Sequence, residues 1–138
     1  IDLIEFNQVT PAVNQIETHL LCQRRTEHEW LEKYRVQHIA YAPLGQGRKN
    51  EMFEHPSLVT IAKAHGKTPA QVALRFLMQS GVAVIPKSVH EGRIKENFDV
   101  FGFELTADEM AQLVKMDTAV PMIGNPENPA VVEAAMKW

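Results

Sequence analysis

The sequence lacks the features that mark several large classes of protein. It has a single cysteine, Cys22, which excludes an internal disulfide framework and fits a reducing compartment such as the cytoplasm. No apolar run approaches the length of a membrane span, and no secretory signal peptide is recognisable. Neither sign of charge dominates, because 14 basic and 17 acidic residues leave a net charge of -3. We therefore expect a cytoplasmic protein with neither nucleic acid nor a membrane as a partner.

The composition is that of a folded protein with a real hydrophobic core. Hydrophobic residues make up 45% of the 138 residues and charged residues 22%, and a chain of this length fits one domain, residues 1–138. The chain opens with Ile-Asp-Leu-Ile, without an initiator methionine or a helix cap. We interpret this opening as a start inside an element, which predicts that the chain is part of something longer.

Hydrophobic periodicity predicts strands and helices in alternation. Strands are expected at 12–17, 36–41 and 82–86, and helices at 24–34, 56–66, 68–80, 90–98, from 106 onward and at about 130–137. The third strand is wholly apolar, which predicts burial on both faces. The spacing favours βαβ units and a parallel sheet, hence an α/β fold.

Several side chains are expected in the core, and two helices have clear start signals. Capping boxes are recognisable at Thr68–Gln71 and at Thr106–Glu109. The apolar spacing predicts inward-facing side chains near the N-terminus and in the helices, namely Leu3, Ile4, Phe6, Trp30, Leu31, Tyr34, Phe76, Met110, Leu113 and Val114.

The segment 85–97 carries the most specific chemical pattern. An apolar strand ends at Lys87 and Ser88, and a polar helix follows on which Arg93, Glu96 and Asn97 share one face. A helix N-terminus with two nearby cations suits an anion with more than one phosphate, and the Glu and Asn would read a purine edge. On spacing alone, an ordinary helix start with a solvated polar face is the slightly favoured interpretation.

The order of residues in this segment resembles the NADP-binding signature of the aldo-keto reductases. The resemblance lies in residues 85–97 (I-P-K-S-x-x-x-x-R-I-x-E-N), 11–17 (P-A-V-N-Q-I-E), 40–45 (A-Y-A-P-L-G) and 101–106 (F-G-F-E-L-T). It covers only the second half of the family's pattern. The family has a (β/α)8 TIM barrel, so the resemblance implies a partial barrel containing the sixth to eighth strands with their helices.

The resemblance also implies a role for each matching residue in binding NADP(H). Gln15 would hold the nicotinamide carboxamide and Tyr41 would stack on the nicotinamide ring, although a Gln that bonds buried backbone and a Tyr that plugs the barrel mouth are alternatives. The remaining implied cofactor residues follow the second and third strands: Ala42, Pro43, Leu44 and Gln46 at the pyrophosphate, and Lys87, Ser88, Val89, Arg93, Glu96 and Asn97 at the adenosine 2′-phosphate and adenine. A cationic cluster here favours NADP over NAD.

The family's catalytic residues are not implied for this chain. The family reduces aldehydes and ketones through a Tyr, Lys, Asp and His tetrad on the first four strands, and none of those motifs occurs here; the two tyrosines are Tyr34 and Tyr41. We expect no catalytic residue, no metal site and no activity in the isolated chain. The two bare edges of three strands predict self-association. The alternative function is a non-catalytic nucleotide-phosphate-binding or assembly module.

Overall fold

A three-stranded parallel sheet lies at the centre of the protein. The computed structural model describes residues 2–46, 49–123 and 128–136. The strands β1 (Val13–Glu17), β2 (Gln37–Tyr41) and β3 (Ala83–Val84) lie side by side in sequence order. Gln15 is opposite Ile39, and Ile39 is opposite Ala83. The predicted α/β class with a parallel sheet is therefore confirmed.

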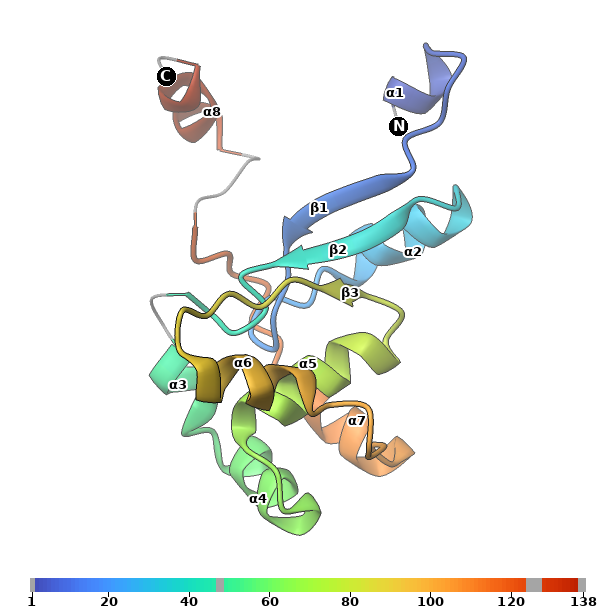
Figure 1. Cartoon of the computed structure of the whole chain (residues 1–138). Helices are drawn as coiled ribbons and strands as arrows, with labels where there is room; N and C mark the ends of the chain where they lie inside the picture. Colours follow the sequence, from blue (N-terminus) through green and yellow to red (C-terminus); the bar gives the residue numbers. More distant parts are fainter. Residues whose placement is uncertain (1, 47–48, 124–127, 137–138) are drawn as a thin grey trace.

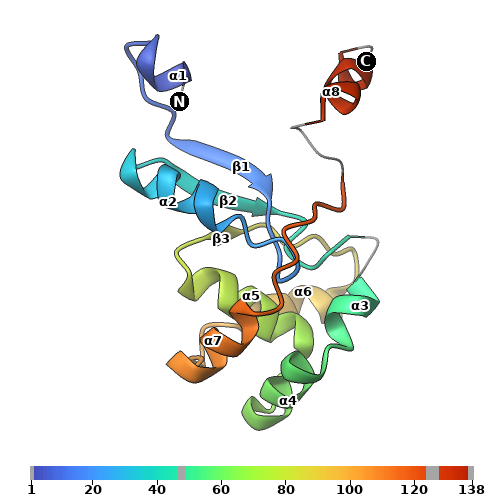
Figure 2. The same ribbon diagram turned by 180° about the vertical axis from the view of Figure 1, so that it is seen from behind.

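Helices connect the strands and cover one face of the sheet. α2 (Arg25–Lys33) joins β1 to β2, while α3 (Lys49–Phe53), α4 (Pro56–His65) and α5 (Pro69–Gln79) lie between β2 and β3. α6 (Glu91–Phe98) and α7 (Ala107–Val114) follow. Figures 1 and 2 show α4, α5 and α7 grouped on one side of the sheet. The terminal helices α1 (Asp2–Glu5) and α8 (Pro129–Ala135) project on the other side, away from this group.

The helix boundaries follow from local signals in the sequence. Both predicted capping boxes form, since Thr68 and Thr106 each accept a bond from the backbone N–H three residues later. α4 ends at Gly66, whose φ of 60° is the left-handed conformation that favours glycine. α3 was not predicted, because its five residues are too few for a helical period. The expected last helix is present as Pro129–Ala135, and its predicted end at residue 137 lies outside the described residues.

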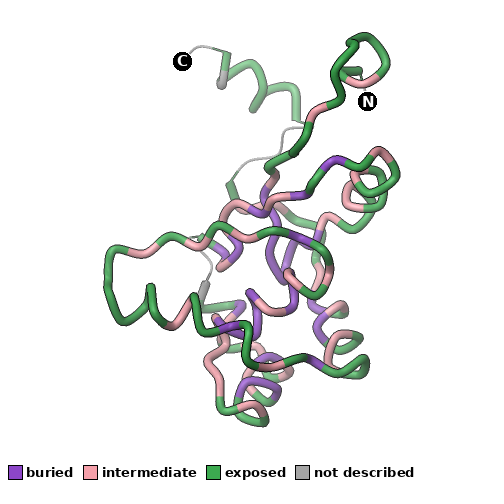
Figure 3. The backbone as a smooth tube through the Cα atoms, turned by 45° about the vertical axis from the view of Figure 1, so that its right-hand side comes forward, coloured by how far each residue is buried: buried purple, intermediate pink, exposed green. Residues whose placement is uncertain are grey.

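The hydrophobic core lies between the sheet and the helices on its covered face (Figure 3). Phe76 of α5 and Leu113 of α7 are buried there as predicted, with Met110 and Val114 packed against the same cluster. Its other buried members lie in the turn after β1, in β2 and α3 to α5, and in the segments next to β3 and α7: Leu20, Leu21, Ala40, Met52, Leu58, Ile61, Ala62, Val72, Ala73, Leu77, Val82, Leu105 and Met116. In the part of the chain that the structure describes, no helix is long and apolar enough to cross a bilayer.

The predicted burial of Leu3, Phe6 and Trp30 was wrong, whereas Ile4 is half-buried. Leu3 and Phe6 are 65% and 82% exposed, because α1 projects from the packed body. Trp30 is 45% exposed and stacks on Tyr34, with the Lys33 ammonium 4.4 Å from its ring centroid. The side of α2 nearest the sheet presents His28 to His38, so the indole lies on the outer side.

The third strand is also shorter and more open than predicted. Only Ala83 and Val84 form β3, Ala83 is exposed, and the next residue, Ile85, is 48% exposed. Its covered face packs on α5, whereas no element among the described ranges covers its other face. An apolar strand is buried on both faces only where other elements cover both faces of the sheet, and here only one face of β3 is covered.

Candidate functional site

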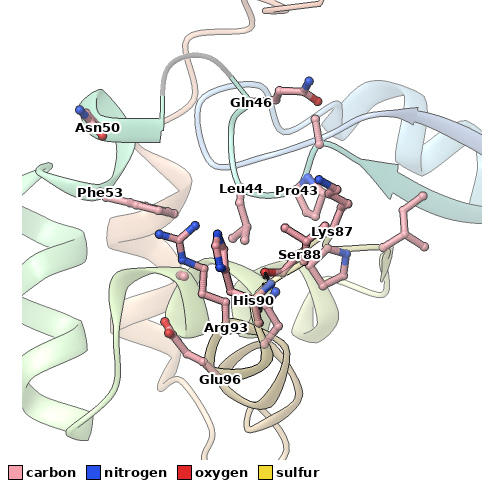
Figure 4. A pocket seen from close by; sticks show the side chains of 16 residues that line it. Pro43, Leu44, Gln46, Asn50, Phe53, Lys87, Ser88, His90, Arg93 and Glu96 are labelled. Carbon is pink, nitrogen blue, oxygen red and sulfur yellow. Dashed lines mark hydrogen bonds between the residues drawn. The ribbon is translucent and has the colours of Figure 1, made fainter.

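A groove of about 800 Å³ opens where β2 and β3 end and where α6 begins. Ten of the twelve residues predicted to bind a cofactor line it: Ala42, Pro43, Leu44, Gln46, Lys87, Ser88, Val89, Arg93, Glu96 and Asn97. The other lining residues come from α3, α5 and the segment before α6: Asn50, Phe53, Ala70, Ile85, Pro86 and His90. Figure 4 shows these side chains around one hollow.

Lys87 and Arg93 supply positive charge to this groove. Lys87 follows β3, and Arg93 lies in the first turn of α6, from which it extends toward Leu44 and Phe53 (Figure 4). Among the described residues, neither cation forms a hydrogen bond or an ion pair, whereas the neighbouring Lys95 is paired with Glu91 at 2.7 Å. Two unpaired cations that line one concave surface are suited to a multiply charged anion.

The first turn of α6 adds backbone donors to the same surface. Its N-cap residue, His90, makes no side-chain capping bond, so the first N–H groups of the helix are not satisfied by that side chain. Ser88 instead fixes the approach to the helix, because its Oγ accepts a bond from the His90 N–H at 3.1 Å. The Ser88 hydroxyl also donates a bond of 3.4 Å to the His90 carbonyl, so the side chain is already used in a local turn.

Glu96 is held by the start of α5. Its Oε1 accepts a bond of 2.5 Å from the Thr68 hydroxyl, and its backbone carbonyl accepts one of 3.2 Å from the Gln71 side chain. Gln71 also bonds the backbone carbonyl of Asp99, just beyond α6. These bonds fix α6, and with it Arg93, relative to α5. Oε2 of Glu96 has no hydrogen-bond partner among the described residues.

The loop after β2 forms the opposite wall of the groove. Ala42 has a φ of 50°, an uncommon conformation for a residue with a side chain. Gly45 has a φ of 64° and donates its N–H to the Ala42 carbonyl at 2.9 Å. A Cβ on Gly45 would lie 3.5 Å from the Met52 methyl and 3.7 Å from that of Met122. The turn therefore depends on glycine for its backbone conformation, and its packing leaves little spare room.

Gln15 and Tyr41 do not line this groove. Gln15 is exposed on β1, and Tyr41 is half-buried at the end of β2, opposite Glu17 of β1. Burial raises the pKa of the Tyr41 phenol, which keeps it neutral at physiological pH. Tyr41 directly precedes the groove residue Ala42, whereas Gln15 lies on the neighbouring strand β1.

Phe53 and Asn50 of α3 and His90 at the start of α6 are groove residues that the sequence did not indicate. Phe53 and Asn50 lie in a helix of five residues, and His90 is an N-cap residue. Such short segments show no repeating apolar pattern from which they could be predicted. The one sequence signal for α3 is the apolar pair Met52–Phe53 within a charged stretch, which suggests that this segment packs on the core. Met52 is indeed fully buried.

The described residues contain no metal-binding cluster, and the single thiol is buried. No group of three or more His, Cys, Asp or Glu residues there has the arrangement of a metal site. The Cys22 thiol is buried, and burial raises its pKa to about 11, so it is protonated and unreactive.

Comparison with known proteins gives a consistent assignment. The model of the Aldo/keto reductase family matches residues 3–118. "Methylglyoxal reductase DkgA" of Escherichia coli is 44% identical over 115 residues, which cover 83% of this chain and 42% of the relative. A crystal structure of an aldo-keto reductase from a Medee basin deep-sea metagenome library has a TM-score of 0.89 at 36% identity, covering 91% of this chain and 46% of that one.

A third similar structure is that of a mutant of Gox0644 in complex with NADPH. It has a TM-score of 0.82 and 41% identity, over 89% of this chain and 44% of that chain. The chain thus spans less than half the length of these relatives. The family match extends over most of the chain and over all the segments that line the groove. The chain belongs to the aldo/keto reductase family.

Proposed function

We propose that this chain is the cofactor-binding half of an NADP(H)-dependent oxidoreductase that reduces small aldehydes or ketones. In this proposal β1, β2 and β3 are the sixth, seventh and eighth strands of a (β/α)8 barrel, residues 1–138 are a single C-terminal unit, and the location is cytoplasmic. The observation that carries the proposal is the position of Lys87 and Arg93, two cations without a protein partner among the described residues, in one groove at the start of α6.

The groove residues fit the adenosine end of such a cofactor. Lys87, Arg93 and the backbone N–H groups of the first turn of α6 would bind the 2′-phosphate. Oε2 of Glu96 and the Asn97 amide would contact the adenine edge, and the turn at 42–46 would follow the pyrophosphate. When bound, the nicotinamide supplies the hydride for carbonyl reduction. Gln15 and Tyr41, which do not line the groove, are proposed to contact the nicotinamide.

Titration calorimetry with 2′,5′-ADP, NADPH and NADH tests this function. We expect binding of 2′,5′-ADP and NADPH and markedly weaker binding of NADH, because only the first two carry the 2′-phosphate. Equal affinity for NADPH and NADH would contradict the assignment of Lys87 and Arg93. The isolated chain is expected to reduce no small aldehyde with NADPH, since the tetrad motifs are absent; turnover above background would refute that part.

Self-association is the second element of the proposal, and it also supports the alternative function of an assembly module. β1 and β3 are both edge strands in the described part of the sheet. Beside the β3 edge, Ile94, Phe98 and Phe101 are 52%, 75% and 63% exposed and line a second hollow of about 1020 Å³. Exposed apolar surface next to an unpaired strand edge favours pairing with a second copy.

Light scattering at micromolar concentration tests self-association. We expect an oligomer, and we expect Phe101→Glu to shift it toward the monomer, because the charge would be buried in the contact. Met136→Glu, at an 83% exposed position on the C-terminal side of α8, is the matched control and should leave the assembly unchanged. A monodisperse monomer of the unaltered chain would contradict the proposal.

A further inference from the structure

The Glu17 carboxylate lies at the end of β1 and is 2% exposed, although it is outside the groove. Its Oε1 accepts hydrogen bonds from the Met122 N–H at 2.5 Å and from His19 Nε2 at 3.1 Å, and its Oε2 accepts one from the Ile123 N–H at 3.1 Å. His19 Nδ1 accepts a bond from the Leu21 N–H at 3.2 Å, which fixes the imidazole hydrogen on Nε2. Every one of these partners is a donor, so both side-chain oxygens must be acceptors.

The bonds to Glu17 hold a segment that is more than a hundred residues away in sequence. Residues 117–123 follow α7, and their first part is fixed to the turn after β1. Thr118 donates its N–H and its hydroxyl to the Leu21 carbonyl at 2.9 and 2.7 Å. Asp117 accepts the Gln23 N–H at 3.1 Å. Glu17 then fixes the next residues of the segment at the end of the sheet.

The segment held by Glu17 contacts the wall of the groove. The Met122 side chain is packed against the hydrophobic core, and its methyl lies close to Gly45, next to Met52. Gly45 closes the turn formed by residues 42–46, four of which line the groove. Glu17, Met122 and Gly45 thus form a continuous connection from β1 to the groove wall.

We infer that Glu17 is a positioning residue, which seats the groove wall at residues 42–46 by holding Met122 against Gly45. Within the described part of the chain, its carboxylate forms no hydrogen bond to a groove residue and acts through the C-terminal segment. The consequence for ligand affinity rests on the proposed function, because it assumes that the groove binds a phosphorylated nucleotide. The effect on the wall itself does not depend on that assumption.

Two variants and two measurements test this inference. In Glu17→Gln the side-chain amide N–H would face the backbone N–H of Met122 or Ile123, which would lose its acceptor. Met122→Ala removes the contact with Gly45 and leaves Glu17 intact. Without ligand, we expect hydrogen exchange at the Gly45 amide to become about tenfold faster or more in both variants, with the α5 amides unchanged. The control is Ile123→Ala, which retains the backbone donor and removes a side chain that is 47% exposed.

The second measurement is calorimetric titration with 2′,5′-ADP. We expect about fivefold weaker binding by both variants, the cost of ordering one or two side chains during binding, and no change for the control. Unchanged exchange at Gly45 in Met122→Ala would overturn the inference, even if Glu17→Gln does not fold. A looser Gly45 with unchanged affinity would confirm that the wall is seated in this way and would overturn the predicted effect on ligand affinity. If the unaltered chain binds no nucleotide, the proposed function fails, while the exchange measurement still decides whether Glu17 seats the wall.

Discussion

The Thr68 hydroxyl donates a hydrogen bond of 2.5 Å to Oε1 of Glu96, and this bond ties the first turn of α5 to the helix that carries Arg93. Thr68 is at the same time the N-cap of α5, where its Oγ accepts the Gln71 N–H at 3.3 Å. One side chain therefore starts a helix and orients the groove. The Thr106 hydroxyl has the capping role alone, with Glu109 as its partner.

Replacement of Thr68 should therefore affect both stability and binding. We expect Thr68→Ala to lower the free energy of unfolding by about 1–2 kcal/mol, the usual effect of a lost N-cap. We also expect weaker binding of 2′,5′-ADP, because Glu96 loses its donor and α6 loses one of its bonds to the start of α5. Thr106→Ala is the matched control, with a similar loss of stability and unchanged binding. Urea denaturation and calorimetry measure the two effects, and equal binding by both variants would contradict the orienting role.

Arg93 should contribute more to binding than any other cation on α6. We expect Arg93→Ala to weaken 2′,5′-ADP binding by about tenfold or more, since a hydrogen bond between charged groups contributes roughly 1.5–3 kcal/mol. Arg93→Lys should restore only part of the affinity, because an ammonium cannot make the forked contact. Lys95→Ala is the control, at a 75% exposed side chain paired with Glu91. A loss of equal size in Lys95→Ala would show that only net charge matters.

His38 should make the protein less stable in mild acid. It is 1% exposed, and burial, with His28 as a second cause, lowers its pKa from 6.5 to about 4. Thr18 Oγ1 lies 2.7 Å from its Nε2, and His28 Nδ1 lies 3.1 Å from its Nδ1. Glu32 contacts His28 at 3.4 Å, and the charges of Glu27 and Arg24 oppose each other at His38. The imidazole is therefore neutral in the folded state at neutral pH.

The unfolded chain binds a proton at His38 near pH 6.5, whereas the folded protein does so only near pH 4. The free energy of unfolding should therefore fall as the pH drops through this window, by about 3 kcal/mol at most from this residue. Urea denaturation between pH 7 and pH 4 measures the slope. His38→Gln should flatten it, because the amide does not titrate. An unchanged slope in this variant would assign the acid sensitivity to other groups.

Two glycines next to the groove should respond oppositely to alanine. Gly45 has a φ of 64° and close neighbours, so Gly45→Ala should lower the free energy of unfolding by about 1 kcal/mol or more. Gly92 lies within α6, where an added Cβ would meet no neighbouring side chain or element within 4 Å, so Gly92→Ala should raise it by about 0.5–1 kcal/mol. Thermal unfolding of the two variants provides the comparison. Stabilisation by Gly45→Ala would contradict the conformation of the 42–46 turn.

Signals confined to neighbouring residues predicted much of the fold correctly. The capping boxes at Thr68 and Thr106 start helices where expected, and Gly66 ends one. These features depend on bonds within one helical turn, which the sequence specifies directly. Burial was harder to predict, as Trp30 and Phe6 show, because it depends on which other elements cover a given face.

The candidate site shows the same division between local and long-range information. The motif at 85–97 and the segment at 40–46 were both recognised, and their residues line one groove. Phe53 and His90 were missed, since a five-residue helix and a cap position have no period of their own. The connection from Glu17 to Met122 was also missed, because no local pattern links residues so far apart.

By itself the sequence determined the family, the alternation of strands and helices, the ends of the capped helices and the residue types of the groove. These are set by short-range bonds and by side-chain order along the chain. Only the tertiary structure decided that Lys87 and Arg93 share a groove with Phe53 and that a buried carboxylate on β1 holds a segment after α7. Such relationships arise when distant segments are packed together, so the geometry of the packed chain, and no local pattern, determines them.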